Sequence, residues 1–121
     1  MYGQELILDI HDCASLPCSR KFIKQYFIEL CDLIDMERCE LHFWDYDGLP
    51  FEYESAPDHL KGRTAVQFIK TSNITIHTLD DLKKIFVNIF SCKQFDTDQV
   101  ATFTAKYFMG QIKKQTCIRR I

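Results

Sequence analysis

One short stretch of the sequence holds residue types that can act as nucleophile and acid–base catalyst. Residues 70–78 read KTSNITIHT and include Ser72 and His77, and Cys92 follows at the end of the next apolar segment. A serine hydroxyl can act as a nucleophile, a histidine moves a proton near neutral pH, and a thiol can donate one. Taken alone, the same residues also fit a hairpin turn at Ser72-Asn73, a strand histidine and a core thiol, because Ser, His and Cys are common.

The composition predicts one soluble domain spanning residues 1–121. Hydrophobic residues make up 46% of the chain and charged residues 26%, which is ordinary for a globular protein. No apolar run approaches the ~20 residues of a membrane-spanning helix. The N-terminus lacks a basic segment followed by an apolar one, and the net charge is −2. We therefore expect a cytoplasmic protein with no membrane or nucleic-acid partner.

The six cysteines raise the question of disulfides or a metal site. Their spacing includes no Cys-x-x-Cys pair, and no paired histidines stand at zinc-site spacing, so no metal is expected. Without an export signal, reduced thiols are favoured over disulfides. Most of the six are expected to be buried as small hydrophobic residues.

The apolar periodicity predicts both strands and helices. Alternation predicts strands at residues 5–11, 39–46, 63–71, 74–78, 84–91 and 112–121, with a tight turn at Ser72-Asn73. Helical spacing predicts helices at residues 20–36 and 97–109. Ser19 suits the N-cap of the first helix, and Gly110 is expected to end the second. Residues 47–62 are expected to form an acidic loop, since they hold two of the three prolines.

This order of elements predicts an α+β fold. Both helices can lie on one face of a mainly antiparallel sheet, which gives a two-layer α/β sandwich. The other face of the sheet must then be solvated or covered by a partner. Aromatic residues on several predicted strands make a second subunit the expected cover.

The spacing within the reactive stretch resembles that of a known family. Small prokaryotic-type S-adenosylmethionine decarboxylases carry Glu-Ser-His-x-(Ser/Thr)-Ile-His-Thr, then a strand that ends in Phe-(Thr/Ser)-Cys. The positions of this chain that match are Ser72, residues 74–78, residues 90–92, Gly62 with Thr64 two residues later, and residues 6–13 in the first strand. The steps from serine to histidine and from histidine to cysteine fit without a gap.

The resemblance implies that Ser72 becomes a pyruvoyl cofactor by self-cleavage between Thr71 and Ser72. The fragments would have 71 and 50 residues. The pyruvoyl carbonyl would form a Schiff base with a small-molecule substrate and accept electrons as carbon dioxide leaves. By the same resemblance, Cys92 donates the final proton, and Thr64 replaces a serine that assists processing. His77 can move a proton during cleavage.

The resemblance also implies substrate contacts and a homodimer. Phe43 and Trp44 lie in the strand that supplies an aromatic platform for adenosine, and the choice between them stays open. Asp81 stands where the family has a glutamate. The function implied is S-adenosylmethionine decarboxylation for spermidine synthesis.

Several positions depart from the family pattern and keep two alternatives open. Thr71 and Asn73 replace a glutamate and a histidine, and Leu79-Asp80-Asp81 replaces Trp-Pro-Glu. One alternative is the same chemistry on a cationic amino acid such as arginine or ornithine, which the acidic loop would suit. The other is an uncleaved homologue that acts as a binding or regulatory subunit.

Overall fold

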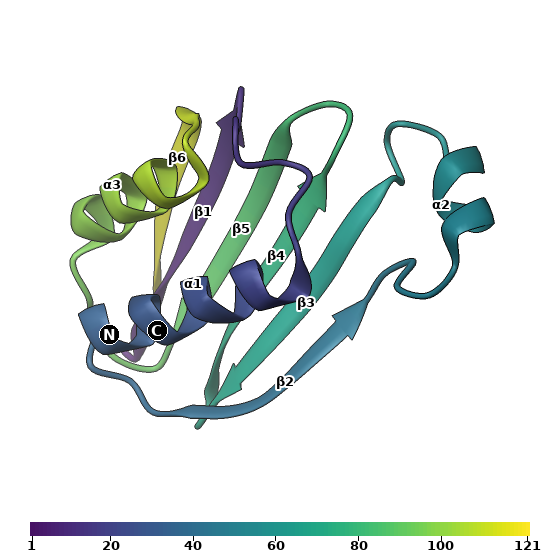
Figure 1. Cartoon of the computed structure of the whole chain (residues 1–121). Helices are drawn as coiled ribbons and strands as arrows, with labels where there is room; N and C mark the ends of the chain where they lie inside the picture. The colour runs from purple at the N-terminus through teal and green to yellow at the C-terminus, as the bar shows by residue number, and fades with distance from the viewer.

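The computed structural model describes all residues, 1–121, as one sheet with three helices (Figure 1). The strands are β1 (Gly3–His11), β2 (Arg38–Trp44), β3 (Gly62–Ile69), β4 (Ser72–Leu79), β5 (Lys84–Ser91) and β6 (Gln111–Arg120). The helices are α1 (Arg20–Leu33), α2 (Pro50–Ser55) and α3 (Thr97–Phe108). None of the helices combines the length and the apolar character needed to cross a membrane.

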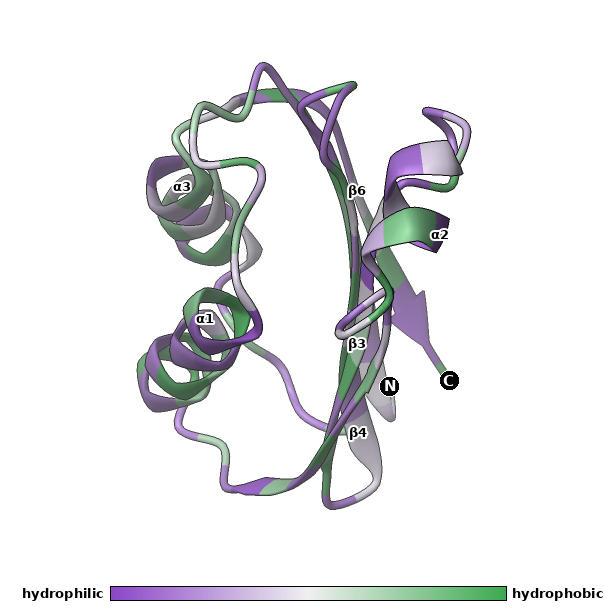
Figure 2. Ribbon diagram, turned by 45° about the vertical axis from the view of Figure 1, so that its right-hand side comes forward, coloured by the Kyte–Doolittle hydropathy of each residue, from purple (hydrophilic) through white to green (hydrophobic).

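The six strands form a single sheet in the order β2-β3-β4-β5-β1-β6, and every neighbouring pair is antiparallel. Helices α1 and α3 lie side by side on one face of this sheet, while α2 lies on the opposite side (Figure 2). The predicted α+β sandwich is therefore confirmed. We call the face that α1 and α3 cover the helix face, and the other the open face.

The core lies between the helix face and the two long helices. In β1 and β4 every second side chain is buried, as a strand with one covered face requires. Tyr26 of α1 is fully buried, and its hydroxyl lies 2.8 Å from the Thr104 hydroxyl of α3, which satisfies both polar groups. The predicted N-cap is also confirmed, because Ser19 Oγ accepts a hydrogen bond from the Phe22 N–H.

The predicted loop at residues 47–62 contains a helix that the composition does not reveal. Pro50 occupies the first turn of α2, where its missing N–H costs nothing, and Ser55 ends this helix. Prolines indicate a loop by composition, but Pro50 begins a helix. Acidic residues at the start of this region are also paired: Asp45, just before the segment, binds Arg20 and Arg63, and Asp47 lies 3.7 Å from Arg20.

The end of α3 differs from the prediction in one residue. Met109, not Gly110, adopts the left-handed conformation that closes the helix, with φ of 57°. Gly110 has a packing role, because a Cβ there would lie 2.7 Å from the Cys13 Sγ. Gly110 therefore follows the end of α3 as expected, but packing against Cys13 requires it there, not a left-handed backbone conformation.

The tight turn between β3 and β4 lies one step earlier than predicted. Ile69 pairs with Ser72, so the connecting residues are Lys70 and Thr71, and Ser72 is the first residue of β4. The prediction of a turn at Ser72-Asn73 is wrong, because the alternation of buried and more exposed side chains in β4 already begins at Ser72. At the other end of this hairpin, a Cβ on Gly62 would lie 1.6 Å from the Thr78 backbone oxygen, so β3 and β4 approach closely there.

The expectation that most cysteines are buried is wrong. All six are free thiols, but only Cys13 and Cys31 are buried, and Cys39 and Cys117 are exposed. Cys39 is in the edge strand β2 and Cys117 is in the edge strand β6, where one side of the strand has no neighbour. Position at the rim of the sheet therefore decides their exposure.

Candidate active site

Ser72 and Cys92 lie together at the end of the β4–β5 ladder. The Cys92 N–H donates a hydrogen bond of 2.9 Å to Ser72 Oγ, which fixes the serine hydroxyl beside the cysteine. Ser72 is 7% exposed, whereas Cys92 is only partly buried. Gly3 of β1 also presses on this point, since a Cβ there would lie 3.0 Å from the Cys92 Cα. The structure thus brings two of the predicted catalytic residues into contact.

Thr71, the residue before Ser72, has a strained backbone. Its φ is 52°, and of the five non-glycine residues with positive φ it is the one with a β-branched side chain. A β-branched residue is a true outlier in this region, at a cost of about 1–2 kcal/mol. The strain therefore falls on the residue whose carbonyl carbon a Ser72 nucleophile would attack.

The surroundings lower the pKa of the Cys92 thiol below its ordinary value. The main cause is a hydrogen bond with the Ser72 hydroxyl, and the Thr71 hydroxyl adds to it. Hydroxyl donors stabilise the thiolate more than the thiol. The buried thiols behave oppositely, since burial raises the pKa of Cys13 and of Cys31 to about 11. Cys92 is thus chemically distinct from the buried cysteines.

Thr64 and His77 form a second pair on the open face. They are register partners on β3 and β4, and Thr64 Oγ1 lies 2.9 Å from His77 Nδ1. A cavity of about 310 Å³ adjoins the pair, and Trp44 and Phe86 also line it. Trp44 is 67% exposed, so its ring is free to contact a ligand.

The two pairs do not meet within one chain. Ser72 and His77 are five residues apart on β4, an odd number, so their side chains point to opposite faces of the sheet. At ~3.3 Å per residue, their Cα atoms are about 16 Å apart along the strand. The expectation that His77 could move a proton for Ser72 is therefore not met inside a single subunit, and the same holds for Thr64.

The remaining predicted site residues are divided between the two faces. Phe43 packs against the core, and the Arg20 guanidinium lies 5.3 Å from its ring centre, so Trp44 is the better placed of the two candidate platforms. Asp81 follows β4 and forms an ion pair of 3.3 Å with Lys61. Asp81 therefore already has a partner in the chain.

Two residues beside the Thr64–His77 pair escaped the sequence analysis. Phe86 lies opposite His77 in the β4–β5 register, and His59 comes from the segment after α2. Once the β4–β5 turn is placed, the register would have identified Phe86. Nothing in the local sequence around His59 indicates that it returns to the open face.

Comparison with known proteins supports the sequence motif. A family model described as S-adenosylmethionine decarboxylase matches residues 4–120, which is nearly the whole chain. The chain belongs to the S-adenosylmethionine decarboxylase family. A search of curated proteins gives no significant match. Membership of this family supports a decarboxylase-like function, with the two residue pairs described above as its candidate active-site groups.

The hydrogen bonds to Cys92 predict how its reactivity changes with pH. A thiol alkylates as the thiolate, and its pKa is lowered, so the alkylation rate of Cys92 should rise at a lower pH than that of free cysteine. In Ser72→Ala the main hydrogen bond is lost, and the midpoint should move to higher pH. The measurement is iodoacetamide labelling against pH, with peptide mapping, on chains whose Thr71–Ser72 bond is intact.

Labelling of Cys117 in the same samples is the control, because this exposed thiol lies on β6, away from Ser72. Equal midpoints for Cys92 in the wild type and in Ser72→Ala would contradict the role of the Ser72 hydroxyl.

Proposed function

We propose that the chain is a cytoplasmic, pyruvoyl-dependent S-adenosylmethionine decarboxylase of polyamine synthesis that cleaves itself between Thr71 and Ser72. The observation that carries the proposal is the strained backbone of Thr71 directly before Ser72. The Ser72 hydroxyl oxygen is held beside Cys92 by a hydrogen bond from the Cys92 N–H. A pyruvoyl group fits this position, because such a group can be made from a serine of the chain itself and Ser72 supplies the hydroxyl. Cys92 would then lie next to the pyruvoyl group formed from Ser72.

The cleavage chemistry needs no oxidant or other co-reactant besides water. Ser72 Oγ adds to the Thr71 carbonyl carbon, and the bond from this carbon to the Ser72 nitrogen breaks, which leaves an ester and a free amine. Loss of the Ser72 α-proton then breaks the Cβ–O bond and releases Thr71 as a carboxylate. Hydrolysis by one water then releases the nitrogen of residue 72 as ammonia and leaves a ketone in its place. Relief of the Thr71 strain favours the first step.

The decarboxylation stage assigns a proton-donor role to Cys92. When formed, the pyruvoyl group binds the substrate amine and serves as the electron sink for the departing carbon dioxide. The Cys92 thiol, which forms a side-chain hydrogen bond with Ser72, then supplies the proton that replaces the carboxyl group. The exposed Trp44 ring offers a platform on which adenine can stack.

We also propose that the enzyme is a homodimer whose sites are shared between subunits. The open face carries exposed aromatic side chains, with Trp44 at 67% and Phe68 at 45%, which a second sheet would cover. Because Ser72 and Cys92 lie at the ends of β4 and β5, a second sheet on the open face that overlaps these strand ends would let the Thr64–His77 pair of one subunit reach the Ser72–Cys92 pair of the other around the rim of the sheet. A shared site would let His77 move a proton for Ser72 of the other subunit, which the distance between these residues prevents within one chain.

Carbon dioxide release from carboxyl-labelled substrate tests the proposed activity. S-adenosylmethionine should release carbon dioxide, whereas arginine and ornithine should not. Ser72→Ala should be inactive, and Cys92→Ala should turn over about a hundredfold or more slowly, because general acids contribute roughly that much.

Cys117→Ala is the matched control and should keep wild-type activity, since Cys117 is an exposed thiol on β6. Release from arginine or ornithine alone would reject the proposed substrate. Full activity of Cys92→Ala would reject its role as proton donor.

Co-expression of two inactive variants tests whether sites are shared. Ser72→Ala and His77→Ala should each be inactive alone. If the site combines Ser72 of one subunit with His77 of the partner subunit, the mixed dimer holds one intact site, and activity should return to a fraction of the wild-type level. No recovery, in a mixture shown to contain the mixed dimer, would contradict sharing.

A further inference from the structure

Asp80, just after β4, is a buried carboxylate with an unused oxygen. The residue is 4% exposed, and its Oδ2 accepts a hydrogen bond of 2.7 Å from the Tyr53 hydroxyl of α2. Its Oδ1 has no hydrogen-bond partner. An unpaired buried carboxylate oxygen is costly, so such a group in a native structure calls for a partner. In the sequence, Asp80 stands out only as a departure from the Trp-Pro-Glu pattern.

The cations near Asp80 already have other partners. Arg63 donates from Nη1 to Asp45 at 2.5 Å and from Nε to the Cys18 carbonyl at 2.9 Å. Arg20 shares the same Asp45 carboxylate at 2.6 Å.

These two guanidinium groups hold the pKa of Asp45 well below its usual range, with the Arg20 hydrogen bond as the largest cause. Lys61 pairs with Asp81 at 3.3 Å. Arg63, Arg20 and Lys61 thus each pair with another carboxylate. Lys83, three residues after Asp80, donates to the Leu16 carbonyl instead, so Asp80 is in none of these pairs.

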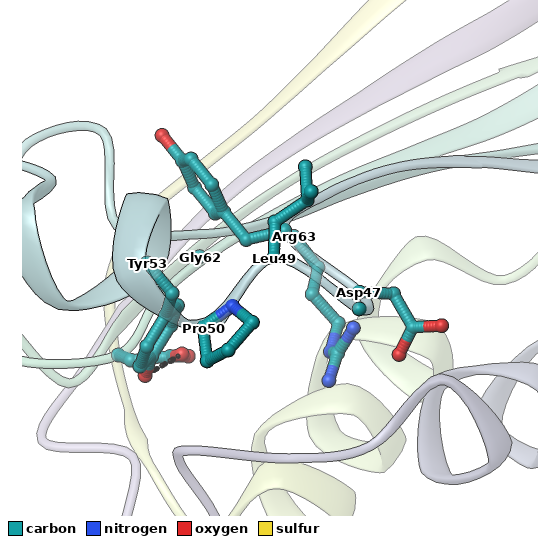
Figure 3. Close-up of a pocket in the computed structure, with 9 residues that line it drawn as sticks. Asp47, Leu49, Pro50, Tyr53, Gly62 and Arg63 are labelled. Atoms are coloured by element: carbon teal, nitrogen blue, oxygen red, sulfur yellow. Dashed lines mark hydrogen bonds between the residues drawn. The ribbon is translucent and has the colours of Figure 1, made fainter.

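A cavity of about 380 Å³ adjoins Asp80, between α2 and the start of β3. In Figure 3 the Tyr53 and Pro50 side chains stand on one side of this cavity and the Arg63 side chain on the other. Tyr46 and Leu49 complete much of the wall, and the Tyr46 and Tyr53 rings lie 6.1 Å apart, edge to face. Aromatic faces beside a carboxylate attract an organic cation. Lys61 Nζ, 5.3 Å from the Tyr53 ring centre, already shows this contact.

We propose that this cavity binds a small organic ammonium ion, with the Asp80 carboxylate as its counter-ion. The ammonium group would donate to Asp80, and a short carbon chain would lie against Tyr46, Leu49 and Pro50. A metal ion fits less well, since no group of three His, Cys, Asp or Glu side chains is placed to hold one. Ser72 lies about 26 Å away along β4 at ~3.3 Å per residue. The cavity shares Gly62 and Arg63 with the cavity beside the Thr64–His77 pair but none of that cavity's other lining residues.

Calorimetric titration of the full chain with n-butylammonium chloride tests the proposal, with n-butanol, sodium chloride and magnesium chloride as comparison ligands. Saturable binding of n-butylammonium is expected, with none of n-butanol, because the charge is required. Asp80→Asn should weaken binding at least tenfold, since the amide still accepts from Tyr53 but has no charge. Glu52→Gln is the matched control, because it removes a negative charge of α2 that does not line the cavity, and binding should stay unchanged.

The wild-type comparison of n-butylammonium with n-butanol needs no variant, so it decides the question even if Asp80→Asn fails to fold. Equal binding of the alcohol, or no saturable binding of the ammonium ion, would overturn the proposal. So would competition by magnesium at equal or lower concentration, which would indicate a metal site. The titration does not depend on cleavage or on catalytic activity, so its result is independent of the proposed function.

Discussion

The two-residue connection between β3 and β4 is the constraint on which the candidate site depends. Because only Lys70 and Thr71 join these strands, Ile69 must pair with Ser72, and the whole register follows from that pair. The register places Thr64 opposite His77 and sets Ser72 at the end of the ladder, next to Cys92. The same short connection forces Thr71 into the left-handed region. A single turn thus determines the position of Ser72 as the candidate nucleophile, its contact with Cys92 and the strain at Thr71.

The alternation of the strand then divides the chemistry between two faces. Side chains on the helix face are committed to the core beneath α1 and α3, so reactive groups are accessible only at the ends of strands or on the open face. Ser72 and Cys92 lie at the ends of strands, and His77 lies on the open face. This division is the reason why we propose a dimer that places a second sheet on the open face.

The architecture can be predicted from the sequence better than the turns and side-chain contacts around the candidate residues. Strand β5 and the start of α1 follow directly from alternation, helical spacing and the Ser19 cap. The turn before Ser72 cannot be located from residue types, because Ser-Asn is a common turn pair whereas Lys70-Thr71 carries no turn signal. The opposite orientation of Ser72 and His77 was available from their odd separation. The unpaired oxygen of Asp80 depends on α2, which proline-rich composition concealed.

Intact-mass spectrometry of the purified full-length chain under denaturing conditions tests self-cleavage most directly. Cleavage at Thr71–Ser72 gives two fragments, of 71 and 50 residues, and the shorter one should begin with a carbonyl group that reacts with hydroxylamine instead of a free amine. Both species should be present in equal amounts. A single species of 121 residues that persists after prolonged incubation would contradict the pyruvoyl mechanism and leave the chain as an uncleaved member of its family.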